Sequence, residues 1–232
     1  MTLMRPAEAR TFWKALMDNA ASLVDDAHLL VEAGSFGRAR SLTVLAQEEL
    51  GKALWIYETF ERSWSEGASE ALVVDELAKG GRHHVRKYAR AYVFGSELEE
   101  FWGHFDVDRW TPRDGETEEE MLARWEHEAD EAATLANSAK QSGFYVDRDK
   151  AGAITSPRDV ERGSIPEDLQ TAAQVIEMML ITDHSRMKLE ASTPYDSTHA
   201  QQFRLLPITH PEDWDAASEE FRQGATRHGR DG

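Results

Sequence analysis

Two glutamates and a lysine lie within five residues in the segment Glu48–Lys52. Helical periodicity places Glu49 on a stripe of apolar side chains that includes Ala46. Glu48 falls about 100° away around the same helix, where it can pair with Lys52. Because a carboxylate on an apolar stripe must be neutralised or matched by cations, we expect Glu49 to face the interior and to have a basic partner.

The densest positive charge is in the segment Arg82–Arg90, so this segment is the expected source of that partner. On a helix, His84 and Lys87 share one face, and we expect both to approach Glu49. A carboxylate, an imidazole that titrates near neutrality and a lysine can together transfer protons or bind phosphate. The alternative is a structural salt-bridge network that fixes the register of the helices.

If this group cleaves RNA, we expect His84 to act as the general acid or base. Lys87 would stabilise the developing charge on phosphate, and Glu49 would orient the histidine. The candidate catalytic residues are Glu48, Glu49, Lys52, His84 and Lys87. The second face of the basic segment is expected to contact RNA or a partner through Arg82, His83, Arg86 and Arg90.

Long amphipathic helices must position these residues. Pro6 suits the first turn of a helix whose apolar side chains recur at three- and four-residue steps until Gly34. After the short turn at 34–37, a second helix runs through Leu42 to Phe60. Because the turn is short, we expect the two helices to pack antiparallel.

Further helices are predicted over 68–77, 82–94, 116–142, 169–183 and 212–222, and an irregular loop or small hairpin over 143–166. The predicted fold is an all-α antiparallel helical bundle with additional helices. We expect one domain over 1–232, with a core at about 6–192 and a C-terminal extension at 193–232.

Composition limits the environment and the partners. The 232 residues include no cysteine, which excludes disulfides and cysteine zinc sites and favours a reducing, cytoplasmic setting. No apolar run reaches the roughly 18 residues needed to span a membrane, so we expect no membrane association. The formal net charge of -17 means that any contact with RNA must be local.

Several segments resemble the AbiV family of bacterial abortive-infection proteins, which is placed among HEPN-like helical domains. The resemblance covers about residues 15–160 and rests on 19–27, 34–39, Glu48–Lys52, His84–Lys87, 142–147 and the pair Ser156-Pro157. It implies a HEPN-like helical core and a role in defence against bacteriophage. It also gives functional weight to Tyr145, as a contact for RNA or a partner, and to the charged residues of two motifs, Glu48, Glu49, Lys52, His84 and Lys87.

In the wider HEPN group, this resemblance implies frequent RNA cleavage or binding, often by homodimers. We therefore expect an effector that acts on RNA or on a translation component, with a metal-independent ribonuclease as the specific hypothesis and a phage protein as a candidate activator. The alternative is a non-catalytic module that binds protein or RNA and blocks translation by association. No cofactor or metal is expected.

HEPN ribonucleases commonly carry an arginine four to six residues before a histidine on a late helix. Here this spacing occurs at Arg204 to His210 and at Arg222 to His228, in proline- and glycine-containing segments. A metal site from Glu48, Glu49, His83 and His84 is a further alternative. We interpret Asp183 with His184 as part of an exposed helix face.

Overall fold

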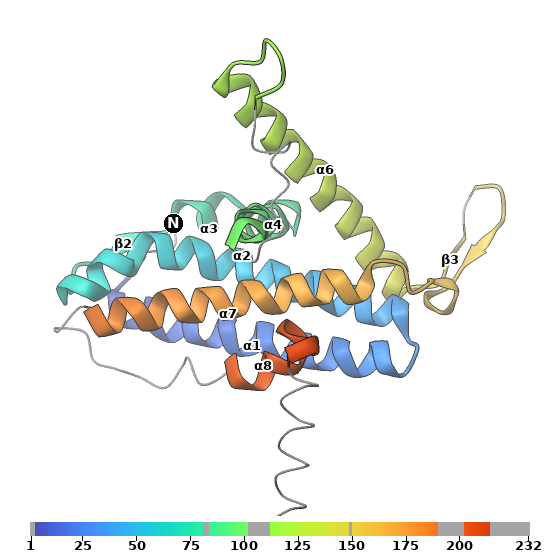
Figure 1. Ribbon diagram of the computed structural model, residues 1–232, viewed down its shortest axis with the longest axis horizontal. Coiled ribbons are helices and arrows are strands. Elements are labelled where there is room, and N and C mark those ends of the chain that lie inside the picture. The colour runs from blue at the N-terminus through green and yellow to red at the C-terminus, as the bar shows by residue number, and fades with distance from the viewer. Residues whose placement is uncertain (1–2, 81–83, 102–111, 149, 190–201, 214–232) are drawn as a thin grey trace, which may run out of the picture.

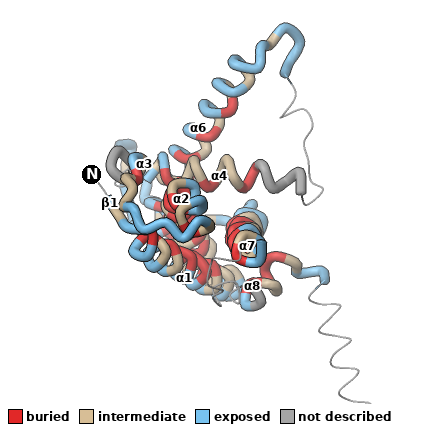
Figure 2. Tube along the Cα trace, turned by 90° about the vertical axis from the view of Figure 1, so that its left-hand side faces the viewer, coloured by how far each residue is buried: buried red, intermediate tan, exposed pale blue. Residues whose placement is uncertain are grey.

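The computed structural model describes residues 3–80, 84–101, 112–148, 150–189 and 202–213. Three long helices lie side by side: α1 (Pro6–Glu32), α2 (Phe36–Glu66) and α7 (Ile165–Leu189) (Figure 1). Helix α4 (His84–Phe101) crosses α2, and the C-terminal part of α6 (Glu118–Phe144) packs against α2 and α4. The N-terminal part of α6 extends away from the other helices (Figures 1 and 2).

The remaining elements are short. Strand β1 (Leu3–Met4) pairs antiparallel with β2 (Leu72–Val73), with Leu3 opposite Val73, and β2 is followed by α3 (Asp75–Gly80). Strand β3 (Asp147–Arg148) pairs antiparallel with β4 (Ile154–Thr155), with Asp147 opposite Thr155. A 3-10 turn, η1 (Pro157–Asp159), leads toward α7, and α8 (Gln202–Thr209) packs on α7.

The predicted all-α bundle is confirmed, and so is the small hairpin within 143–166. The helix predicted over 68–77 is wrong, because this segment supplies β2 to a pair with the N-terminus before α3 begins. The predicted stop before Gly95 is also wrong, because α4 continues to Phe101 and Gly95 packs against α7. Helix α8 was not predicted, and most of the helix predicted over 212–222 lies outside the described residues.

Helix α2 is the central element, since it contacts α1, α4, α6 and α7. Its buried side chains therefore surround most of the helix instead of forming one stripe. Figure 2 shows the buried residues concentrated where α1, α2 and α7 face one another. The largest fully buried side chains at this interface include Trp13, Met17, Leu50, Ile56, Phe60 and Ile176. In the described part of the chain, no helix is long and apolar enough to cross a membrane.

Glycines permit close crossings on α2. A Cβ atom at Gly51 would overlap the backbone carbonyl of Lys87, so α4 can lie this close to α2 only because Gly51 has no side chain. A Cβ atom at Gly143 would similarly overlap the carbonyl of Gly37, where α6 crosses α2. These two crossings determine where the polar side chains of α4 and α6 meet α2.

We expect Gly51→Ala to destabilise the protein by about 2 kcal/mol or more, because α2 and α4 must separate to accept the methyl group. In an open helical position the same change would stabilise by up to about 1 kcal/mol. Gly95→Ala is the matched control, since its Cβ would meet side-chain methyl groups of Val175 and Thr171 at 3.2 and 3.4 Å, which can shift. Urea unfolding measures both variants, and equal stability of Gly51→Ala and the parent would contradict the close-crossing argument.

Candidate functional site

A buried carboxylate, Glu48, lies in the middle of α2 and is surrounded by basic side chains from two other helices. Lys140 Nζ of α6 donates to Glu48 Oε1 at 2.5 Å, and His84 Nδ1 of α4 lies 2.6 Å from Oε2. Lys87 Nζ lies 3.5 Å from the same Oε2. The Glu48 side chain is only 3% exposed. We call Glu48, His84, Lys87 and Lys140 the Glu48 network.

The start of α4 supplies two members of the network. His84 is the first residue of α4, and Lys87 follows three residues later on the same face. Gly51 lies three residues after Glu48 on α2, so the close crossing at Gly51 brings the first turn of α4 over the carboxylate. The prediction that His84 and Lys87 approach Glu49 is wrong, because both side chains reach Glu48, the preceding residue of α2.

Lys140 was not predicted. It continues a buried stripe of small residues on α6 that contains Ala129, Ala133 and Ala136. The hydroxyl of Ser41 anchors α6 there, since its Oγ lies 2.9 Å from the carbonyl of Lys140 and can donate to it. A single lysine on an alanine stripe was the sequence signal that could have identified this residue, because lysine is rarely buried without a partner.

The charges of the network hold Glu48 in its ionised form. Burial acts to raise its pKa, but hydrogen bonds from His84 and Lys140 and their positive charge outweigh burial, so the pKa of Glu48 lies below the ordinary value of 4.5. With both lysines protonated, the network carries a net positive charge even when His84 is neutral. Such a cluster attracts an anion at whichever of its members is open to solvent.

His84 is that member, because its side chain is 52% exposed while both lysines are buried. An ionised carboxylate can only accept hydrogen bonds, so His84 Nδ1 must be the donor to Glu48. In the neutral ring, Nε2 then carries the lone pair. Within the described residues Nε2 has no hydrogen-bond partner, so this nitrogen is available to accept a proton from a bound molecule.

The prediction that Glu49 faces the interior is wrong. Glu49 forms an ion pair with Lys52 at 2.6 Å, and both side chains are about one-fifth exposed. The predicted pairing of Glu48 with Lys52 is wrong for the same reason. Glu49 lies with Leu42, Leu45 and Lys52 on the least covered face of α2, because four other helices pack around the remaining faces.

The second face of the basic segment is occupied by glutamates. Arg86 pairs with Glu76 at 2.7 Å, and Arg90 pairs with Glu58. These residues line a cleft of about 500 Å³ whose other wall includes acidic side chains of α6. A role of Arg86 and Arg90 in RNA binding stays a prediction, and Arg82 and His83 lie outside the described residues.

Tyr145 lies apart from the Glu48 network. It follows the last residue of α6, is exposed, and its ring contacts that of Phe144 at 6.4 Å between centroids. The metal alternative is not supported by the arrangement of its residues, since Glu49 faces away from Glu48 and the described residues contain no cluster of three metal-ligating side chains. His83 of that set lies outside the described residues.

Arg204 and His210 hold α8 against the bundle. Arg204 pairs with Asp25 of α1 at 2.5 Å, and His210 Nε2 lies 3.0 Å from Glu177 of α7. The two side chains thus have separate carboxylate partners on different helices. Arg222 and His228 lie outside the described residues.

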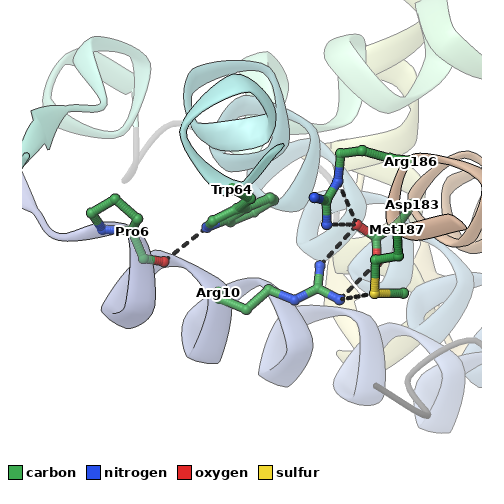
Figure 3. Close-up of polar contacts among 6 residues, drawn as sticks. All are labelled: Pro6, Arg10, Trp64, Asp183, Arg186 and Met187. Atoms are coloured by element: carbon green, nitrogen blue, oxygen red, sulfur yellow. Dashed lines mark hydrogen bonds and ion pairs between the residues drawn. The ribbon is translucent and has the colours of Figure 1, made fainter. Parts of the chain in front are cut away.

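A second buried carboxylate, Asp183, joins α1 and α7 (Figure 3). Arg10 of α1 binds it with both terminal nitrogens, at 2.9 and 2.7 Å, and Arg186 donates to it at 2.8 Å. Trp64 lies beside both guanidinium groups and donates to the carbonyl of Pro6 at 2.8 Å. The interpretation of Asp183 as part of an exposed helix face is therefore wrong, because that face of α7 packs on α1.

The comparison with protein families gives a match between residues 8–177 and the HEPN_AbiV family model, described as AbiV. The matched region begins in α1 and ends within α7, so it contains all four residues of the Glu48 network. Helix α8, with Arg204, lies beyond it. The comparisons with curated proteins and with solved structures gave no match.

At neutral pH we expect Glu48→Gln to lower the free energy of unfolding by about 3 kcal/mol, because two buried lysines lose their counter-charge. Glu49→Gln is the matched control and should cost less than about 1 kcal/mol, since its ion pair is partly exposed. Urea unfolding of the parent and both variants measures these costs.

The cost of Glu48→Gln should also depend on pH. The folded-state pKa of Glu48 lies below the unfolded value of 4.5, so its contribution to stability is complete above that value and is lost as the pH falls through the folded-state pKa. The stability difference between the parent and Glu48→Gln should therefore shrink below pH 4.5. A difference that stays constant there would contradict the depressed pKa.

Proposed function

This chain belongs to the AbiV family of HEPN-like abortive-infection proteins, and from that premise we propose that it is a phage-defence effector that cleaves RNA with His84 as its proton-transfer residue. One observation carries the proposal. His84 is oriented by a buried, ionised carboxylate through Nδ1, while its other ring nitrogen is open to solvent beside a net positive charge. This combination is the usual arrangement of a histidine base that acts on a negatively charged substrate.

The proposed reaction needs no metal. His84 Nε2 accepts the proton of a ribose 2′-hydroxyl, and the 2′-oxygen attacks the adjacent phosphorus. The bond from phosphorus to the 5′-oxygen breaks, and water supplies the proton that the leaving oxygen takes. The products are a 2′,3′-cyclic phosphate and a 5′-hydroxyl, and Glu48 stabilises the imidazolium that forms.

The rest of the network supports binding of the phosphate. Lys87 and Lys140 together exceed the charge of Glu48, so the network itself carries a net positive charge on a chain of net charge -17. Glu48 takes the orienting role that the sequence pattern gave to Glu49.

A non-catalytic module that blocks translation by association is the second candidate, and two observations favour it. The network contains a single imidazole, whereas RNA cleavage is fastest with both an acid and a base. Arg86 and Arg90 are already paired with Glu76 and Glu58. In this case the Glu48 network would only hold α2, α4 and α6 together.

Three further expectations from the sequence and from the family remain part of the proposal. The effector would act in the cytoplasm as a homodimer and would be switched on by a phage protein. Its target would be RNA itself or RNA within a translation component.

The test incubates purified full-length protein with total RNA and follows cleavage by gel and by end-group analysis. We expect fragments with 2′,3′-cyclic phosphate ends, and a loss of at least about 100-fold in His84→Ala. His127→Ala is the matched control, because His127 is an exposed histidine on α6 that pairs only with Glu131 among the described residues, and it should cut like the parent. Circular dichroism checks that both variants are folded.

Two outcomes would reject the catalytic proposal. If the parent cuts no RNA, cleavage by this chain alone is excluded and the non-catalytic module remains. If the parent cuts RNA and His84→Ala cuts equally well, the cleavage site lies elsewhere and the Glu48 network is structural.

A further inference from the structure

A pocket of about 330 Å³ lies between α2, α6 and the start of α7, with Tyr88 of α4 at its wall. It shares no residue with the Glu48 network. Its apolar wall includes Val44, Ala136 and Ile165, all buried. Pockets that bind small organic molecules have this size and this mixture of apolar and polar walls.

Gln47 is the first sign that the pocket has an occupant. Its side chain lines the pocket and the residue is only 6% exposed. Its amide forms no hydrogen bond with any residue that the structure describes, although neither amide atom is sealed from the pocket space. An amide that faces the pocket without a protein partner can both donate to and accept from a polar atom of a bound molecule.

Two side chains of opposite charge in the pocket are the second sign of an occupant. Arg40 and Asp168 both line the pocket, and in the described part of the chain they form no ion pair with each other. Burial raises the pKa of Asp168 while the nearby Arg40 guanidinium acts to lower it, which places the two charges near each other. Asp168 accepts a hydrogen bond from the Ser164 hydroxyl at 3.1 Å, and Arg40 has no such bond within the described residues.

The spacing along α2 relates these two signs. Arg40 and Gln47 are seven residues apart, so they lie on one face of α2 about 10 Å from each other along its axis. Val44 lies between them on the same face. A molecule that spans the pocket would therefore meet charges at one end, an apolar wall in the middle and an amide at the far end.

We propose that this pocket binds a free aromatic amino acid that carries a polar atom on its ring, such as tryptophan. Its carboxylate pairs with Arg40 and its ammonium group with Asp168. Its ring packs against Val44 and Ile165, and the polar ring atom bonds with Gln47. A nucleotide fits less well, because the two charged side chains sum to zero and its phosphate would bring additional negative charge near Asp168.

Isothermal titration calorimetry of the full chain with L-tryptophan tests the proposal, and we expect one site per chain. Tryptamine lacks the carboxylate and indole-3-propionate lacks the ammonium group, so each should bind at least about tenfold more weakly. Arg40→Gln should weaken L-tryptophan binding by a similar factor. Arg38→Gln is the matched control, since Arg38 is an exposed arginine of α2 outside the pocket, and it should bind like the parent.

Gln47→Leu tests the polar contact at the far end of the pocket independently of the two charged contacts. This variant should weaken L-tryptophan more than L-phenylalanine, which has no polar ring atom. Absence of L-tryptophan binding to the folded parent at millimolar concentration would overturn the proposal, and so would equal binding by Arg40→Gln and the parent. Tighter binding of adenosine monophosphate than of L-tryptophan would overturn it in favour of a nucleotide.

Discussion

The burial of the Glu48 carboxylate is the constraint on which the arrangement of α2, α4 and α6 depends. A charge that is 3% exposed is tolerated only if donors surround it, and its donors come from α4 and α6. Among the side chains that the structure describes, α4 buries Ala91 and Ser96, and α6 buries Trp125, three alanines and Gly143. The ion pairs at Glu48 work in only one register of these helices, so they contribute to how the helices meet.

The other buried carboxylate, Asp183, lies in a different environment. Asp183 is held by Arg10 and Arg186, and both guanidinium groups also lie beside Trp64 in a closed environment between α1, α2 and α7. Burial and the Asp183 charge raise the pKa of the neighbouring Tyr57 to about 12, so that hydroxyl keeps its proton at neutral pH. The charged groups of this cluster, Asp183, Arg10 and Arg186, are all largely buried, so the cluster can stabilise packing. The Glu48 network contains a half-exposed imidazole, His84, which is why the two clusters support different roles.

The sequence allowed the long helices, the hairpin and the meeting of α2 with the basic segment to be predicted, because each depends on local periodicity or on a strong charge contrast. It did not allow Glu48 to be distinguished from Glu49. Periodicity assumes one buried stripe per helix, whereas α2 is covered by four helices and exposes only a narrow face. Lys140 was missed because it lies 92 residues after Glu48, and only the tertiary crossing at Ser41 and Gly143 brings it near. Strand β2 was missed for a similar reason, since its partner is at the N-terminus.

The Glu48 network and the pocket lie on neighbouring residues of the same two helices. Gln47 precedes Glu48 on α2, and Tyr88 follows Lys87 on α4. Adjacent helical residues point about 100° apart, so one crossing of α2 and α4 directs one residue of each pair into the ion network and the other into the pocket. A molecule bound in the pocket would touch α2, α4, α6 and α7 together and would favour the arrangement in which Glu48 meets its donors. The two sites are therefore separate in chemistry but depend on the same packing, and this dependence follows from the absence of a side chain at Gly51.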